Sequence, residues 1–140
     1  MKTLSIFICL LLLSALSFEG VASEYQVIAH TQFPSDSISK SELRKLFLLK
    51  KKYYLSTPVL VTNLSKDNAA RISFSLDVLR KDAVNMERYY FKRALSGKSV
   101  ALEPLDSESD LIKKVQSNTG AIGYVGAESD TSGVKVLKVE

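Results

Sequence analysis

Residues 118–125 read Asn-Thr-Gly-Ala-Ile-Gly-Tyr-Val, a polar stop followed at once by an apolar strand. The polar part ends a helix that begins at the Ser107 cap, because Asn and Gly commonly terminate helices. The apolar part, residues 121–125, predicts a strand, and residues 134–137 predict the next one. A helix leading directly into a strand is the unit from which the rest of the chain is built.

The same alternation runs back toward the N-terminus. Ser39 and Glu42 form a capping box, which makes the helix over 40–49 the best marked of the predicted elements. We also predict strands over 25–30, 59–62 and 100–102, and helices over 69–79 and 83–95. Strands that alternate with helices predict an α/β fold with a mostly parallel central sheet flanked by helices.

Composition limits the class of protein. The chain has 140 residues, of which 46% are hydrophobic and 24% charged, so it is one globular domain and not a disordered chain. A single cysteine, Cys9, excludes an internal disulfide framework. The net charge of +4 favours an anionic partner without requiring one.

The first 22 residues have the pattern of an export signal. Lys2 precedes an apolar run over 4–16, and the small residues Gly20 and Ala22 suit signal peptidase cleavage. A membrane anchor is the alternative, but the run is shorter than the roughly 20 apolar residues that a span needs. We therefore expect a signal peptide over 1–22 and an exported domain over 23–140. Export argues against a nucleic-acid partner.

Enzymatic groups are hard to find in this sequence. The lone His30 has no second histidine with which to complete a metal site, and no serine lies in a G-x-S-x-G elbow. The carboxylates are scattered, so no acid and base pair stands out. Gly120, Gly123 and Gly126 lack the dinucleotide-binding spacing. We predict a non-enzymatic protein without a metal or cofactor.

A basic and aromatic run, Lys-Lys-Lys-Tyr-Tyr over 50–54, follows the helix over 40–49. Cations at this position complement the negative end of the helix dipole, so a solvated helix end explains the run. Contact with anionic lipid or polysaccharide is the alternative.

The polar turn over 63–71 is the strongest candidate for a binding site. A loop between a strand and a helix start presents free N–H groups and the positive end of the helix dipole to an oxyanion. The alternative is a plain helix cap in which Asp67 or a neighbour occupies these donors. The predicted ligand-binding residues are Ser65, Asn68, Ala69, Ala70 and Arg71, with Ala69 and Ala70 acting through their backbones.

Four stretches of the chain resemble the phosphate-binding proteins of bacterial ABC transporters. They are the helix segment 43–48 (Leu-Arg-Lys-Leu-Phe-Leu), the strand 59–61, the turn with Arg71 and Phe74, and residues 118–125. The last of these is the most specific. The resemblance covers nearly all of the exported domain but only one of that family's two lobes, and the chain is similar to short, single-lobe exported proteins grouped with the family.

The resemblance implies a Gram-negative periplasmic location, one lobe of a type II periplasmic-binding-protein fold, and an oxyanion ligand, phosphate first. It also implies a role in ABC-type uptake or sensing, with a membrane permease or an envelope protein as partner. In the family a Ser-Gly-Thr turn contacts phosphate, and the matching positions here, 68–70, read Asn-Ala-Ala, so both hydroxyls are lost.

A single lobe leaves the bound anion open to water on one side, where electrostatic attraction is weak. A homodimer or docking on a membrane partner would supply the second wall. The alternative function is a ligand-free interaction protein of an envelope complex that keeps the binding-protein fold.

Overall fold

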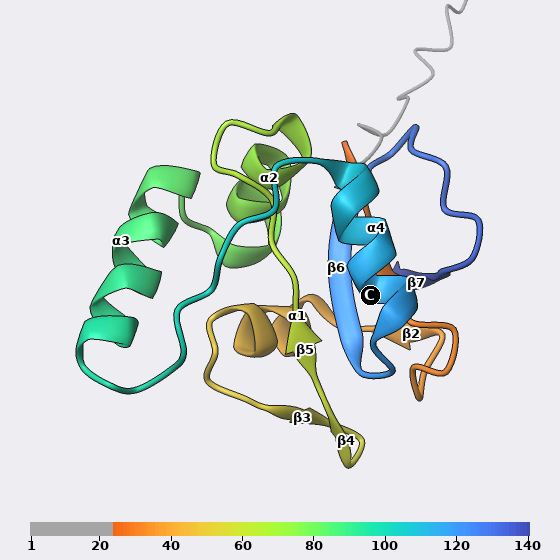
Figure 1. Ribbon diagram of the computed structural model, residues 1–140, viewed down its shortest axis with the longest axis horizontal. Helices are drawn as coiled ribbons and strands as arrows, with labels where there is room; N and C mark the ends of the chain where they lie inside the picture. The colour runs from red at the N-terminus through yellow and green to blue at the C-terminus, as the bar shows by residue number, and fades with distance from the viewer. Residues whose placement is uncertain (1–23) are drawn as a thin grey trace, which may run out of the picture.

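The computed structural model describes residues 24–140, so the predicted signal peptide lies outside the described residues. Within 24–140, no helix has the length and apolar character needed to cross a membrane. The elements in chain order are β1 (Tyr25–Ala29), β2 (Ser37–Ile38), α1 (Lys40–Phe47), β3 (Tyr53–Tyr54), β4 (Thr57–Pro58), β5 (Leu60–Val61), α2 (Ala69–Phe74), the π-helical η1 (Ser75–Leu79), α3 (Ala83–Leu95), α4 (Glu108–Ser117), β6 (Ala121–Gly126) and β7 (Lys135–Val139) (Figure 1).

Five strands form one mixed sheet in the order β2-β7-β1-β6-β5. β5 runs parallel to β6 and β2 runs parallel to β7, whereas the central β1 is antiparallel to both β6 and β7. The α/β class is confirmed, but the prediction of a mostly parallel sheet was wrong. Strand and helix alternation gives the order of elements along the chain, and it does not fix the direction in which β1 enters between β6 and β7.

The longer helices agree with the sequence prediction. α1, α3 and α4 each begin at a side-chain cap, which is Ser39, Asp82 and Ser107 respectively. Each cap accepts a hydrogen bond from a backbone N–H of the first turn that would otherwise lack a partner. The helix predicted over 69–79 is present as α2, which continues into the π-helical η1.

Two short features differ from the prediction. Residues 100–102 form no strand, and the nearest pairing is a single parallel bridge between Leu64 and Leu105. The run after α1 does not stay a simple helix end, because β3 and β4 pair as an antiparallel hairpin. Short apolar runs carry too little periodic signal to separate a paired strand from an extended loop.

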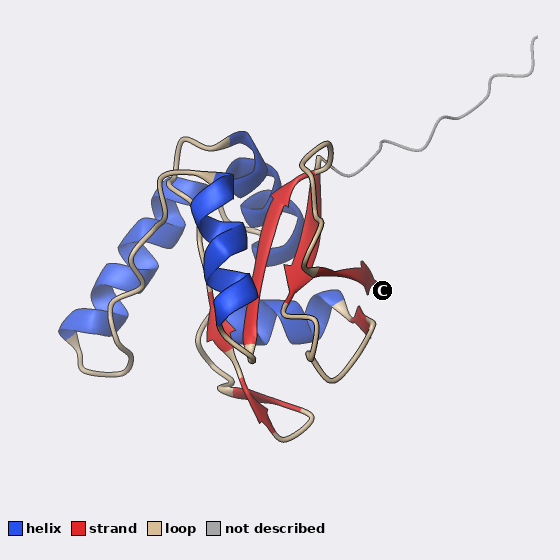
Figure 2. Cartoon of the chain, turned by 45° about the vertical axis from the view of Figure 1, so that its right-hand side comes forward, coloured by secondary structure: helices blue, strands red, loops and turns tan. Residues whose placement is uncertain are grey.

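Aromatic side chains join α1, α2 and β6 in the core. The rings of Phe74 and Tyr124 stack with centroids 4.1 Å apart, and Phe47 meets Phe74 edge-on at 4.7 Å. α4 packs along β6, as Figure 2 shows, whereas α3 lies at the far side of the molecule from β7 in Figure 1. This core holds the carboxyl end of β5, where the predicted site begins.

Candidate functional site

Hydrogen bonds to β6 fix the start of the polar turn. Thr62 Oγ1 donates to the Ile122 carbonyl at 2.9 Å, and the Tyr124 hydroxyl donates to Asn63 Oδ1. The same hydroxyl accepts a hydrogen bond from the Leu64 N–H at 3.3 Å. Burial raises the pKa of the Tyr124 phenol, so the phenol keeps its proton at neutral pH. The start of the turn is therefore anchored to the core.

The Asn68 side chain caps α2. Its Oδ1 accepts hydrogen bonds from the backbone N–H groups of Ala70 at 2.8 Å and Arg71 at 3.3 Å. The plain-cap alternative thus describes this turn, with Asn68 and not Asp67 as the cap. Asp67 is exposed, and its carboxylate pairs with Lys66 at 3.1 Å. Two backbone donors expected to bind an anion already hold an internal oxygen.

Arg71 points into the protein. Its side chain is only 1% exposed, and its Nη1 donates to the Leu64 carbonyl at 2.6 Å. Its Nη2 donates to Glu87 Oε1 on α3 at 2.9 Å. The guanidinium therefore ties the turn to α3, and the geometry does not present it to a ligand in solvent.

Of the other predicted residues, Ser65, Asn68 and Ala69 lie on the outer side of the same turn, whereas Ala70 is buried. Ser65 is half-buried and Ala69 is exposed. The Ser65 N–H donates to the Leu105 carbonyl at 3.1 Å, and the Ser65 carbonyl accepts from the Asn68 N–H at 3.1 Å. The structure thus brings Ser65, Asn68, Ala69 and Ala70 together around one turn, while Arg71 lies behind them in the interior.

The described residues hold no group of three or more His, Cys, Asp or Glu side chains that could bind a metal ion. His30 Nδ1 accepts a hydrogen bond from the Gln32 N–H at 3.1 Å.

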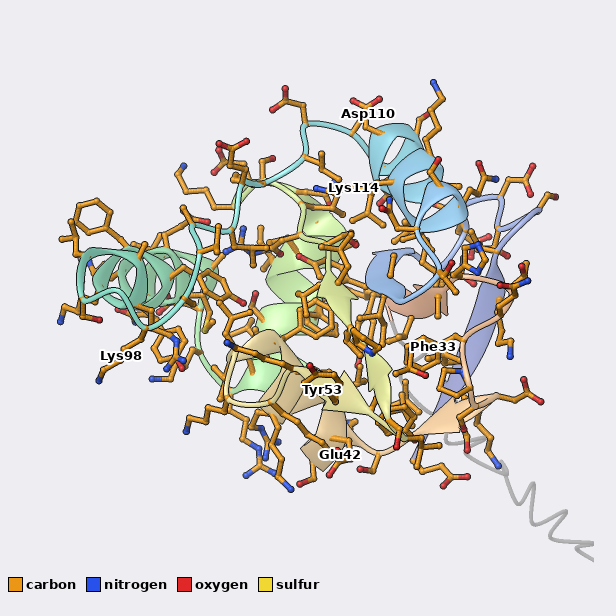
Figure 3. The ribbon with its side chains drawn as sticks, turned by 60° about the horizontal axis from the view of Figure 1, so that its bottom comes forward. Phe33, Glu42, Tyr53, Lys98, Asp110 and Lys114 are labelled. Carbon is orange, nitrogen blue, oxygen red and sulfur yellow. The ribbon has the colours of Figure 1, made fainter. Side chains whose placement is uncertain are left out.

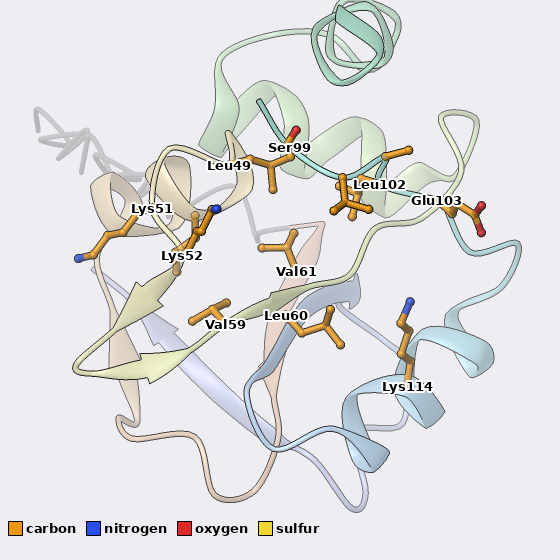
Figure 4. A pocket seen from close by; sticks show the side chains of 13 residues that line it. Leu49, Lys51, Lys52, Val59, Leu60, Val61, Ser99, Leu102, Glu103 and Lys114 are labelled. Carbon is orange, nitrogen blue, oxygen red and sulfur yellow. The ribbon is translucent and has the colours of Figure 1, made fainter. Parts of the chain in front are cut away.

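A groove that sequence reasoning missed lies beside β5. Its volume is about 470 Å³, and it runs between β5 and the segment 99–103 (Figure 4). Leu49, Val59 and Leu102 contribute apolar surface, and Lys51, Lys52 and Lys114 are also among the lining residues. The basic run over 50–52 and the apolar residues at 100–102 were the available signals. Only the fold shows that they face one space.

The chain resembles known proteins at the level of their solved structures. Neither a protein-family model nor a curated protein sequence matches the chain. Solved structures do match it. They include an ABC-type phosphate transport receptor from Vibrio cholerae (14% identity, TM-score 0.60) and a candidate phosphate ABC transporter substrate-binding protein from Clostridium perfringens with bound phosphate (18%, 0.64). A third is PstS from Borrelia burgdorferi (14%, 0.62).

The chain shares part of the fold of phosphate ABC transporter substrate-binding proteins. The matches cover 83%, 83% and 84% of this chain, but only 46%, 44% and 47% of the three solved chains in the order given. The chain therefore spans less than half the length of each of them. The predicted resemblance to this family is confirmed at the level of the fold.

Proposed function

We propose that this chain is a periplasmic-binding-protein-like module that works through protein contacts in the cell envelope and does not carry a small anion. One observation carries the proposal: the donors that would hold an anion are paired inside the protein. Asn68 occupies the Ala70 and Arg71 N–H groups, and the Arg71 guanidinium binds Leu64 and Glu87.

Energies support this choice. Displacing the Asn68 cap costs about 1 kcal/mol, and a charge-assisted hydrogen bond returns about 1.5–3 kcal/mol. The turn has no second wall to exclude water, and in water two unit charges 4 Å apart attract by only about 1 kcal/mol. Binding at 1 mM already requires about 4 kcal/mol. Two such bonds, from the Ala70 and Arg71 N–H groups, less the cost of the cap, return about 2–5 kcal/mol, so we expect any affinity of this turn for phosphate to be near millimolar.

Phosphate binding is the second candidate, and a specific observation favours it. The N–H groups of Ala70 and Arg71 converge on one oxygen, Asn68 Oδ1, and a phosphate oxygen could take that place if the side chain rotated away. The structural match from Clostridium perfringens has bound phosphate. In this alternative Ser65, Asn68, Ala69, Ala70 and Arg71 form the site, and a membrane permease is the partner.

Calorimetric titration of residues 23–140 with phosphate and with sulfate separates the two candidates. The proposed function predicts no saturable heat below millimolar ligand. The matched variant Asn68→Gly removes the side-chain oxygen that accepts from the Ala70 and Arg71 N–H groups. Glycine at a helix cap costs only about a few tenths of a kcal/mol of stability. Saturable submillimolar phosphate binding by the wild-type protein would establish the second candidate in place of the first.

The protein-contact role needs its own test in cells. A photoactivatable amino acid placed at exposed Ile72, Phe91 or Val136 samples α2, α3 and β7. The proposal predicts a discrete protein adduct from at least one position in the full-length, exported chain. Absence of any adduct at these positions and at Leu60 would overturn it.

A further inference from the structure

The outer edge of β5 has a gap in its backbone pairing. β5 bonds to β6 through the N–H groups of Leu60 and Thr62, which donate to Gly120 and Ile122 at 2.9 Å each. Because backbone groups alternate in direction along a strand, the N–H and C=O of Val61 point away from β6. No hydrogen-bond partner for either group is found within residues 24–140.

Both ends of this gap are closed by other segments. On one side the Val59 N–H donates to the Lys52 carbonyl at 2.9 Å. On the other side the Leu105 N–H donates to the Asn63 carbonyl at 2.8 Å. The step from Val59 to Asn63 spans about 13 Å of strand, and the segments paired with its two ends occupy part of that span, so about two residues of another chain fit beside Val61.

The groove described above lies against this gap. Its walls are the β5 side chains on one side and the segment 99–103 on the other, with Leu49 and Leu102 over the space (Figure 4). The volume of about 470 Å³ is in the range of specific ligand sites. Ser99 Oγ, which also lines the groove, is buried without a hydrogen-bond partner among the described residues. The groove is thus apolar, with backbone and hydroxyl groups left to be paired.

Positive charge surrounds the groove. Lys51, Lys52 and Lys114 line it, against a single carboxylate from Glu103. Lys51 is already paired with Glu42 at 2.5 Å, whereas within 24–140 neither Lys52 nor Lys114 forms an ion pair. An occupant with acidic groups beside its apolar part would complement this rim.

We infer that the groove binds a short extended segment of a partner protein, in which acidic residues flank apolar ones. The segment adds a strand to the edge of β5, and its backbone pairs with the Val61 N–H and C=O. Main-chain hydrogen bonds to an open sheet edge provide affinity in this mode, and side-chain pockets provide selectivity. The inference rests on the proposed role in protein contacts and specifies the surface and the partner's chemistry.

A random hexapeptide library displayed on phage, selected on residues 23–140, tests the inference. We expect enriched sequences with two or three apolar residues and at least one flanking Asp or Glu. The selected peptide, added to isotope-labelled protein, should shift the Val61 amide resonance and slow its hydrogen exchange at least tenfold. N-methylation of the peptide's central backbone nitrogens should weaken binding at least tenfold.

Two charge variants give the matched comparison. Lys52→Glu with Lys114→Glu should weaken the selected peptide at least tenfold, and Lys92→Glu, exposed on α3, should leave it unchanged. The inference is wrong if no sequence is enriched, or if enriched peptides bind the groove variant as tightly as the wild type. It is equally wrong if decanoate occupies the groove and the selected peptides leave Val61 unperturbed, because the site would then take a fatty chain. Envelope cross-links that persist after either result would leave the proposed function intact.

Discussion

The sequence alone allows two roles for Arg71, which are binding an anion and pairing inside the protein. A cation beside a helix start is chemically suited to an anion, and the sequence places Arg71 there. Its side chain is nevertheless buried, and its guanidinium donates hydrogen bonds to Leu64 and Glu87. A buried guanidinium must be paired because removing it from water is costly. Pairing inside the protein therefore takes precedence over ligand binding at this residue.

Replacing Arg71 tests its structural role. Arg71→Ala leaves the buried Leu64 carbonyl without its donor and creates a cavity, so we expect a loss of about 3–5 kcal/mol in the free energy of unfolding. Urea denaturation followed by circular dichroism measures it. Lys66→Ala, which removes an exposed cation from the same turn, should change stability by less than about 0.5 kcal/mol. Equal unfolding midpoints for the two variants would contradict a buried structural role for Arg71.

Asp77 gives stability a dependence on acid. Hydrogen bonds from Lys40 at 2.8 Å and Tyr25 at 2.6 Å hold the pKa of its carboxyl below the usual value, with Lys40 the larger cause. A lowered pKa in the folded state contributes stability above the unfolded-state pKa, near 4. That contribution is lost as the pH falls through the folded-state pKa.

We therefore expect Asp77→Asn to reduce stability at pH 7 and to flatten the decline between about pH 5 and pH 2. Thermal unfolding midpoints measured across this range test the prediction. An unchanged acid limb in Asp77→Asn would show that the carboxyl has no such linkage. Both side chains of the Lys40–Asp77 pair are more than two-fifths exposed, so the effect should shrink in high salt.

At the scale of elements, β6 organises the candidate site. Its Tyr124 anchors the polar turn, its edge pairs with β5, and its Gly123 lies against both Thr62 and α4. Figure 3 shows Asp110 and Lys114 on α4, at one side of the molecule, and Lys98 at the opposite side. The strand that carries the most specific sequence signal thus supports the turn and the groove without lining the turn itself.

Close packing on β6 can be tested at Gly123. A Cβ added there would meet Thr62 Oγ1 and would lie 2.8 Å from Leu111 Cδ2, so we expect Gly123→Ala to cost about 1–3 kcal/mol. Gly126→Ala on the same strand is the control, because its nearest contact, the end of the Glu108 side chain at 3.2 Å, need move by only a few tenths of an ångström. Chemical denaturation of both variants decides the matter, and a Gly123 variant as stable as the control would refute the packing argument.

At the scale of the whole molecule, stability is unevenly distributed. The central β1 is bonded on both edges and its Val27 and Ile28 are buried, whereas β3 and β4 form a separate two-stranded hairpin with exposed Tyr53 and Leu55. A two-stranded hairpin alone is marginally stable in water. The hairpin begins directly after the lysine run over 50–52, of which Lys51 and Lys52 line the groove.

We expect amide hydrogen exchange to follow this division. Amides of β1 should exchange only through global unfolding, and that of Tyr54 should exchange at least about a hundredfold faster. Exchange measured by nuclear magnetic resonance at neutral pH tests the expectation. The selected peptide, bound in the groove, should slow hydrogen exchange of the Val61 amide and leave exchange of the β1 amides unchanged. Exchange of the hairpin as slow as that of β1 would show one cooperative unit instead of two.

The sequence alone determined the local structure of this protein. Side-chain caps and apolar spacing depend on neighbours within a few residues, so α1, α3, α4, β1 and β6 could be predicted, as could the α/β class and the likeness to phosphate-binding proteins.

Tertiary structure alone decided the rest. The direction of β1 in the sheet, the burial of Arg71 and the groove between β5 and the segment 99–103 all arise from contacts between residues far apart in the chain. A polar turn has the same sequence whether its hydrogen-bond donors are free or already bonded inside the protein. Only the position of Asn68 Oδ1 and of the Arg71 partners settles that difference, because hydrogen bonding depends on where groups meet in space.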